Sequence, residues 1–167
     1  MLADCLSDLF DKGSRVVDVG SGDGRLAATI AAKRPDLQWE GLDVLVRTPS
    51  RIPIREFDGK TIPVADGWYD EALFVDVLHH AEDPGALLAE GLRVASRAVI
   101  IKDHLRDGFM AEEVLRFMDR VGNERFGVAL TYNYWSRREW SEAFAARGVE
   151  VRQFRDRRAR RMSRWRR

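Results

Sequence analysis

The sequence predicts one α/β domain with a mostly parallel sheet and helices on both faces. Apolar runs that indicate strands alternate with segments of helical periodicity. The first of these runs, residues 16–19, passes through a glycine-rich turn into a helix, which is the start of a strand–turn–helix unit. The chain has 167 residues, enough for one domain with a sizeable core, and it shows no internal repeat or domain boundary.

The first half of the chain alternates helices and strands. Apolar residues at helical spacing, capping glycines and proline breaks set the expected boundaries. We expect a helix at 2–10, a strand at 16–19, a helix at about 23–34, a strand at 37–43 and an extended loop at 44–56. Pro49 and Pro53 exclude a helix from that loop.

The second half continues the alternation. Asp83 is a good N-cap with Pro84 at the first helical position, and Ser136 with Glu139 forms a capping box. We expect a strand at 71–78, a helix at 84–95, a strand at 97–103, a helix at 109–121, an aromatic-rich loop at 122–135, a helix from 136 to Gly148 and a strand at 149–154.

The turn after the first strand predicts a ligand site. Gly20, Gly22 and Gly24 alternate with single residues, and glycine lets a ligand approach the backbone. The following helix presents unpaired N–H groups and a positive dipole end. In the dinucleotide-binding fingerprint the third glycine comes one residue later, where this chain has Arg25, so a nicotinamide dehydrogenase is disfavoured. A turn without a ligand is the alternative, but three alternate glycines after an apolar strand weigh against it.

Composition limits the classes of protein. No apolar run reaches the roughly 18 residues that span a bilayer, and the amino terminus lacks the pattern of a secretory signal. A single cysteine, Cys5, excludes an internal disulfide and a cysteine-rich metal site, and no metal site is expected. The cytoplasm is therefore the expected compartment.

The charge is unevenly distributed along the chain. Residues 151–167 hold nine arginines and one aspartate, a charge of +8, and since the whole chain carries +1, residues 1–150 carry −7. Basic tails of this kind bind nucleic acid or anionic membranes, or remain solvated and disordered. We expect a domain over 1–154 and a basic tail over 155–167.

The ordered set of motifs resembles the class I S-adenosylmethionine-dependent methyltransferases, most closely the type 11, ubiquinone-biosynthesis-like group. The resemblance covers about residues 10–152, and it rests on DVGSGDG at 18–24, Asp43, Asp58-Gly59 and DVLHH at 76–80. It implies a Rossmann-like three-layer sandwich. The family normally ends in an antiparallel strand, and the charge density of 155–167 indicates that this strand is missing or degenerate.

The resemblance also implies a cofactor, S-adenosyl-L-methionine, which becomes S-adenosyl-L-homocysteine. An acid at the end of the second strand can bond two ribose hydroxyls, and in the family the acid–glycine pair lies beside the adenine. The residues expected to bind the cofactor are Asp18, Gly20, Ser21, Gly22, Gly24, Asp43, Val44, Asp58, Gly59, Asp76 and Val77.

The acceptor side is expected at the strand ends that carry histidines. His79, His80 and His104 are candidate general bases, because histidine titrates near neutral pH. The alternative is that they bond only loop backbone. Tyr132, Tyr134 and Trp135 are candidate walls of the acceptor pocket, and the alternative for them is ordinary packing.

The sequence thus predicts methyl transfer to an unidentified small molecule by in-line displacement. Two alternatives stay open: a nucleic-acid methyltransferase that uses the basic tail, and a non-catalytic cofactor-binding or interaction module. Nucleic acid is disfavoured because residues 1–150 are acidic. Pairing of two chains through an uncovered sheet edge also stays open.

Overall fold

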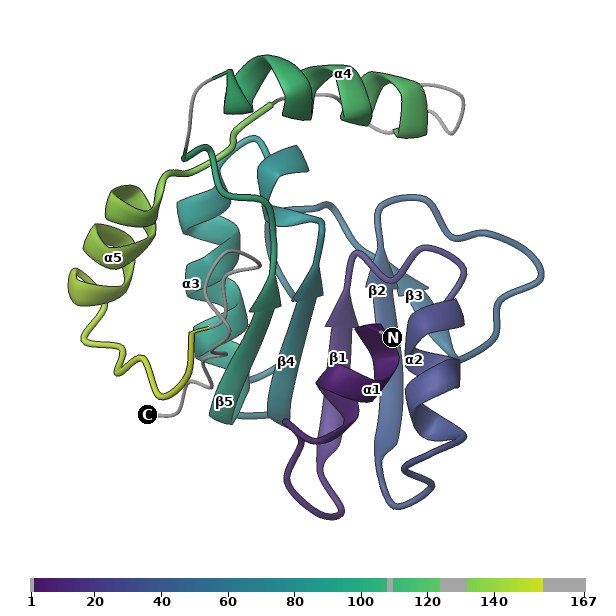
Figure 1. Ribbon diagram of the computed structural model, residues 1–167. Coiled ribbons are helices and arrows are strands. Elements are labelled where there is room, and N and C mark those ends of the chain that lie inside the picture. The colour runs from purple at the N-terminus through teal and green to yellow at the C-terminus, as the bar shows by residue number, and fades with distance from the viewer. Residues whose placement is uncertain (1, 108–109, 124–131, 155–167) are drawn as a thin grey trace.

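Five parallel strands form the sheet in the part of the chain that the structure describes. The computed structural model describes residues 2–107, 110–123 and 132–154. In the sheet order β3-β2-β1-β4-β5, every neighbouring pair is parallel (Figure 1). The strands are β1 (Arg15–Val19), β2 (Gln38–Asp43), β3 (Ile54–Glu56), β4 (Tyr69–Val75) and β5 (Ala95–Lys102). The predicted α/β fold class is confirmed.

Helices cover both faces of the sheet, so the domain has three layers (Figure 1). Helices α1 (Leu2–Ser7) and α2 (Arg25–Ala31) lie on one face, and α3 (Pro84–Val94) and α5 (Arg137–Ala145) lie on the other. A short 3₁₀ turn, η1 (Leu78–His80), follows β4. Helix α4 (Ala111–Asn123) crosses the edge of the sheet at the carboxyl ends of the strands.

Alternation along the strands builds a core on each face. Val16 of β1 packs with residues of α1, whereas its neighbours Val17 and Val19 belong to the core under α3 and α5. In β4, Leu73 belongs to the core under α1, and Phe74 belongs to the core under α3 and α5. This period of two is what a strand buried on both faces requires.

Three expected segments differ from the structure. The loop expected at 44–56 ends in β3, which pairs with β2 at the edge of the sheet, where Pro53 needs no N–H partner. The strand expected at 71–78 begins at Tyr69 and ends at Val75, because Asp76 takes a positive φ of 53°. The strand expected at 149–154 is wrong: among the described residues this segment forms no strand, and only Glu150 makes a β-bridge. Residues 155–167, expected as a basic tail, lie outside the described residues.

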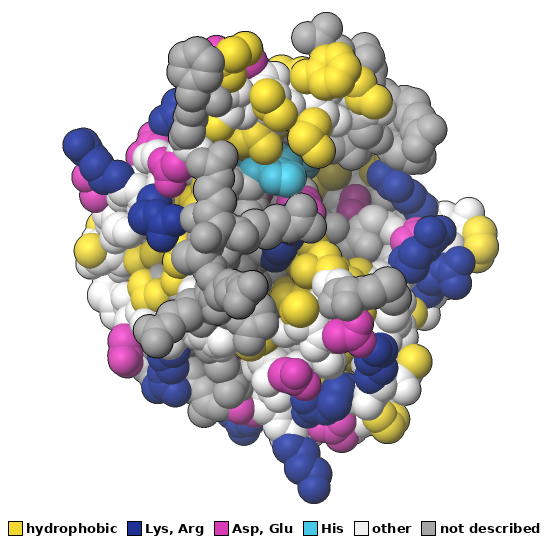
Figure 2. All heavy atoms as spheres, viewed as in Figure 1, with side chains coloured by type: hydrophobic (Ala, Val, Ile, Leu, Met, Phe, Trp, Pro, Cys, Tyr) yellow, Lys and Arg dark blue, Asp and Glu magenta, His cyan; other side chains and the backbone are white. Residues whose placement is uncertain are grey.

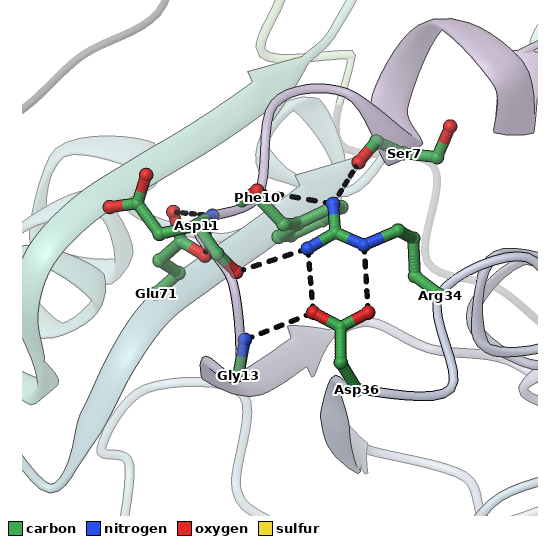
Figure 3. Close-up of polar contacts among 7 residues, drawn as sticks. All are labelled: Ser7, Phe10, Asp11, Gly13, Arg34, Asp36 and Glu71. Carbon is green, nitrogen blue, oxygen red and sulfur yellow. Dashed lines mark hydrogen bonds and ion pairs between the residues drawn. The ribbon is translucent and has the colours of Figure 1, made fainter.

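Helix α1 is held in place by the arginine drawn in Figure 3. The guanidinium of Arg34 donates to the carbonyl oxygens of Ser7 (2.8 Å), Phe10 (3.2 Å) and Asp11 (3.3 Å). It also forms a bidentate pair with Asp36, at 2.8 Å for each bond, and this pair holds the pKa of Asp36 well below its usual value. A six-residue helix is not stable alone, so this tether is needed to keep α1 against the sheet.

Replacing Gly91 with alanine is expected to destabilise the domain by about 2 kcal/mol, since a new methyl group would overpack the core. A Cβ at Gly91 in α3 would come within 2.4 Å of the ring of Phe74, which is fully buried. Gly85→Ala in the same helix is the matched control, because its Cβ would meet the far ends of the Arg147 and Asp83 side chains at 3.0 and 3.2 Å and the ring of Trp135 at an ordinary 3.9 Å. Urea unfolding measures both. Equal stabilities of the two variants would contradict the packing argument.

Candidate functional site

The glycine turn lies where the strand order reverses, between β1 and its two neighbours. The backbone N–H groups of Gly20 and Ser21 donate to the carbonyl of Leu42 at 2.8 and 3.1 Å, which fixes the turn to the end of β2. Ligands of open α/β sheets bind beside such a reversal, at the carboxyl ends of the strands. The position of the turn therefore matches a binding site.

The three glycines of the turn all have positive φ, but they differ in what a side chain at each position would contact. A Cβ at Gly20 would lie 2.4 Å from Val77, and one at Gly24 would lie 2.7 Å from Ile52, so both glycines allow close packing. A Cβ at Gly22 would meet nothing within 4 Å. Gly22 therefore borders open space, where a ligand can approach the backbone.

Asp43 at the end of β2 is oriented by the turn. Its Oδ2 accepts a hydrogen bond from the N–H of Gly22 at 2.7 Å, and its Oδ1 accepts one from the N–H of Leu45 at 2.9 Å. A carboxylate has about four lone-pair sites, so two remain for hydroxyl groups of a ligand. Both oxygens are thereby held beside the open side of Gly22.

Asp18 lines a pocket on the α1–α2 side of the turn. Its side chain is almost fully buried and makes no hydrogen bond to any residue that the structure describes. Burial, with a smaller contribution from the charge of Asp43, raises the pKa of Asp18 to about 7. The pocket has a volume of about 410 Å³, and its lining residues are Ala3, Asp18, Gly20, Ser21, Asp23, Arg25, Leu26, Thr29 and Val75.

A third group of predicted residues meets beyond β2. A Cβ at Gly59 would lie 3.0 Å from the Val44 side chain, so the two residues are neighbours, and Val44 is 58% exposed. Asp58 accepts hydrogen bonds from the N–H groups of Lys60 and Thr61 at 2.8 and 2.7 Å, and these bonds lower its pKa. An apolar surface and an acceptor with a fixed orientation are thus brought together, as binding of a flat heterocycle requires.

The ends of β4 and β5 carry a cluster of charged and titratable groups. Asp76 forms an ion pair with Lys102 and lies 3.3 Å from Nε2 of His104. Burial lowers the pKa of His104, while the charge of Asp76 opposes this shift. His104 is therefore neutral at pH 7, which is the form that can accept a proton.

The second histidine of the cluster is held by a buried carboxylate. Asp103 pairs with Nδ1 of His79 and also accepts hydrogen bonds from the backbone N–H groups of His79 (3.3 Å) and His104 (2.7 Å). The His79 ring stacks on Tyr134, with centroids 5.1 Å apart. Since the His79 side chain is only 2% exposed, it supports the wall of the site.

The structure brings most, but not all, of the predicted acceptor residues together. His80 lies against His79, with ring centroids 4.1 Å apart, and Tyr132 lies 6.4 Å from Tyr134. Trp135 instead packs on Trp140 of α5, at 4.8 Å, in the core beneath that helix.

Sequence reasoning missed the contribution of α1, whose Ala3 lines the pocket beside Asp18. It also missed Thr29 and Val75 in the same lining. No local sequence signal marks these residues, because their approach to the turn depends on how α1 and α2 pack on the sheet.

The comparisons with known proteins agree with this geometry. A family model described as a methyltransferase domain matches residues 2–153. A search of the curated proteins found no match. Several solved structures are similar in fold over most of the chain.

The YcgJ protein from Bacillus subtilis is 17% identical, with a TM-score of 0.72 over 92% of this chain and 70% of that one. A SAM-dependent methyltransferase from Aquifex aeolicus is 16% identical, with a TM-score of 0.66 over 98% of this chain and 87% of that one. The [4+2]-cyclase SpnF is 20% identical, with a TM-score of 0.67 over 90% of this chain and 56% of that one. At these identities the likeness shows the fold, and one fold can host several reactions.

Proposed function

We propose a function from one premise: the chain belongs to the methyltransferase domain family and is a class I S-adenosylmethionine-dependent methyltransferase. Its acceptor is a small molecule that binds at the carboxyl ends of β4 and β5. The observation that carries this proposal is the arrangement around the glycine turn. A pocket that holds the carboxylate of Asp18 lies against Gly20 and Ser21 of the turn. The cluster of Asp76, Lys102 and His104 lies at the neighbouring strand ends.

The residues present fit S-adenosylmethionine. The carboxylate of Asp18 suits the ammonium group of the methionyl part, and Asp43 suits the two ribose hydroxyls. The open side of Gly22 allows the backbone to lie against the ligand. Val44, Asp58 and Gly59 suit the adenine. When bound, the cofactor supplies an electrophilic methyl group on a sulfonium, so the protein has to align the acceptor and exclude water.

His104 is the residue best placed to take a proton from the acceptor. Its side chain is 34% exposed, and its lowered pKa keeps the imidazole neutral at pH 7. Asp76, 3.3 Å from Nε2 of His104, stabilises the imidazolium that forms. The rings of His79 and Tyr134 lie 5.3 and 6.4 Å from the ring of His104, and His80 and Tyr132 lie against these two rings. The packing of Trp135 against Trp140 argues against a direct role for Trp135.

A small acceptor is favoured over nucleic acid by charge. Residues 1–150, which include every residue of the site, carry a charge of −7. Phosphate backbones are repelled by such a surface, and nucleic-acid enzymes normally present the opposite charge.

Turnover with a panel of small hydroxyl and amine compounds tests the proposal. We expect release of S-adenosylhomocysteine together with a methylated product for at least one class of compound. His104→Gln is expected to slow turnover by about a hundredfold for acceptors that lose a proton, because general-base catalysis contributes on that scale. The same variant should bind S-adenosylhomocysteine as the wild type does.

Two outcomes would contradict parts of the proposal. If S-adenosylmethionine binds but no compound of the panel is methylated, the non-catalytic module is favoured. If His104→Gln and wild type turn over equally, His104 is not the base.

A further inference from the structure

Helix α4 carries its exposed apolar side chains in one row. The row has four large residues spaced four, three and four positions apart, with a fifth on its flank: Met110, Val114, Phe117, Val121 and, beside them, Met118. Each of the five is between 51% and 64% exposed. Figure 2 shows apolar side chains gathered over α4 at the top of the molecule. Isolated apolar residues on a surface are common, but a row of five large ones marks a contact surface.

The row points away from the rest of the described chain. At about 100° per residue, Leu115 and Arg116 lie on the side of α4 opposite to the row. Leu115 is half-buried, and the guanidinium of Arg116 lies over the ring of Tyr132, 5.2 Å from its centroid. These two residues therefore face the domain, and the apolar row faces outward. In Figure 1 the helix lies across the top of the molecule, where a partner can approach it.

The spacing of the row makes it complementary to itself. A spacing of four, three and four is the same from either end, so two α4 helices that lie antiparallel across a two-fold axis present matching positions. Val114 of each copy then faces Phe117 of the other, which sets a small side chain against a large one. At the ends of the row, Met110 faces Val121. Alternation of three and four residues is also the pattern by which paired helices fit side chains of one between those of the other.

The exposed area of the row is enough for a weak dimer. Five side chains of this size at these exposures amount to roughly 500 Å² per chain, so pairing removes about 1,000 Å² from water. An area of that size is at the lower limit of specific interfaces, which bind weakly. Since α4 is already a helix in each chain, pairing adds little ordering cost.

The charges of α4 favour a second copy over an acidic partner. Residues 111–123 hold three acidic residues and two arginines, and residues 1–150 carry −7, so neither attracts an anionic surface. Between two copies the like charges repel weakly, and salt screens that repulsion. Association through the row should therefore become tighter as salt is added, whereas attraction between opposite charges would weaken.

We propose that this protein forms a symmetric dimer in which the α4 helices of two copies pair antiparallel through the row of Met110, Val114, Phe117 and Val121. Arg116 on the other side of α4 contacts Tyr132, so pairing fixes the helix beside the proposed acceptor site. The dimer does not depend on which molecule is methylated.

Sedimentation of the full chain over about a hundredfold range of concentration tests this proposal. We expect a monomer–dimer equilibrium with a dissociation constant on the order of 10 to 100 μM, lower at high salt. Val114→Lys and Phe117→Glu should each raise that constant at least tenfold, because each places a charge against an apolar side chain of the other copy. Val151→Glu is the control, since it adds a charge at a similarly exposed valine (43%) outside α4 and should change the constant less than twofold.

A mixture of the two α4 variants tests the antiparallel pairing. In a mixed dimer the introduced lysine faces the introduced glutamate, and the remaining Val114 faces the remaining Phe117. Each variant alone instead sets two charges against apolar side chains. The mixture should therefore dimerise at least tenfold more tightly than either variant alone.

Three results would overturn the proposal. The first is a monomer at every concentration and salt. The second is a dimer that Val114→Lys and Phe117→Glu leave unchanged, which would place the interface elsewhere. The third is a mixture that dimerises no more tightly than its components. Thermal melting followed by circular dichroism shows that each variant is folded, so that loss of the dimer is not loss of the fold.

Discussion

Replacing Gly22 with aspartate is expected to abolish binding of S-adenosylmethionine and S-adenosylhomocysteine while the domain stays folded. Gly22 is the glycine of the turn whose missing side chain leaves open space, so a carboxylate there fills the volume that the cofactor needs. It also adds a third negative charge beside Asp18 and Asp43. We expect the dissociation constant to rise by roughly a hundredfold or more, measured by calorimetry.

The control for Gly22→Asp is Gly148→Asp. Both glycines have a φ of 62°, and a Cβ at either one would meet nothing within 4 Å. Aspartate in this left-handed conformation costs about 1 kcal/mol of stability, so both variants should unfold at similarly lowered temperatures. Only Gly22→Asp should lose the thermal stabilisation that S-adenosylhomocysteine provides. Equal ligand stabilisation of the two variants would show that the cofactor lies elsewhere.

Replacing Asp18 with asparagine is expected to stabilise the free protein at pH 8 and to stabilise it less at pH 5. The folded pKa of Asp18 is about 7, against 3.8 for an ordinary aspartate, because burial and then Asp43 oppose its ionisation. Between these two values the folded state holds more protons than the unfolded state, so stability falls as the pH rises from about 4 to about 7. Over these three pH units the wild type loses at most about 4 kcal/mol of stability. Asparagine carries no charge, so the variant does not lose this stability.

Melting temperatures at pH 5 and pH 8 measure this effect. The difference between Asp18→Asn and wild type should grow by several degrees over that interval. A constant difference would mean that Asp18 is ionised in the folded protein throughout.

The same aspartate should make cofactor binding depend on pH. The ammonium group of S-adenosylhomocysteine needs an ionised carboxylate, so wild-type affinity should fall by up to about tenfold per unit below pH 7, and Asp18→Asn should bind weakly at every pH. Methylthioadenosine, which lacks the amino-acid part, is the control ligand and should bind both proteins equally. If methylthioadenosine bound the two proteins with different affinities, Asp18 would not be the partner of the ammonium group.

The ionised carboxylate of Asp18 therefore lowers the stability of the free protein and favours binding of the cationic ligand. No described residue donates a hydrogen bond to the buried carboxylate of Asp18, so its charge weakens the free fold, and a cationic ligand relieves that cost. Sites for ligands often carry such costs.

The local patterns that were predicted correctly are those that a short segment determines. Alternate glycines after an apolar run predict the turn from Gly20 to Gly24, since its positive φ values are local requirements. Asp83 and the Ser136–Glu139 capping box predict the starts of α3 and α5 for the same reason. No strand spans 149–154 in the described chain, where only Glu150 makes a β-bridge, because a strand depends on cross-strand pairing along its length and an apolar pattern does not supply it.

Local sequence patterns do not distinguish the roles of the three histidines. His79, His80 and His104 look alike in the sequence, as three imidazoles that follow strands. In the structure Asp103 holds His79 within the wall, while His104 stays partly exposed beside Asp76. These roles depend on residues 24 to 28 positions apart along the chain, which the pairing of β4 with β5 brings together.

The sequence by itself therefore determined the fold class, the glycine turn and the family, because glycine spacing and hydrophobic period act within a few residues. Only the tertiary structure decided which aspartate is buried with no hydrogen bond from a described residue, and which histidine is buried against a carboxylate. Burial and electrostatic environment arise from elements that pack across the sheet, and no short stretch of sequence contains that information.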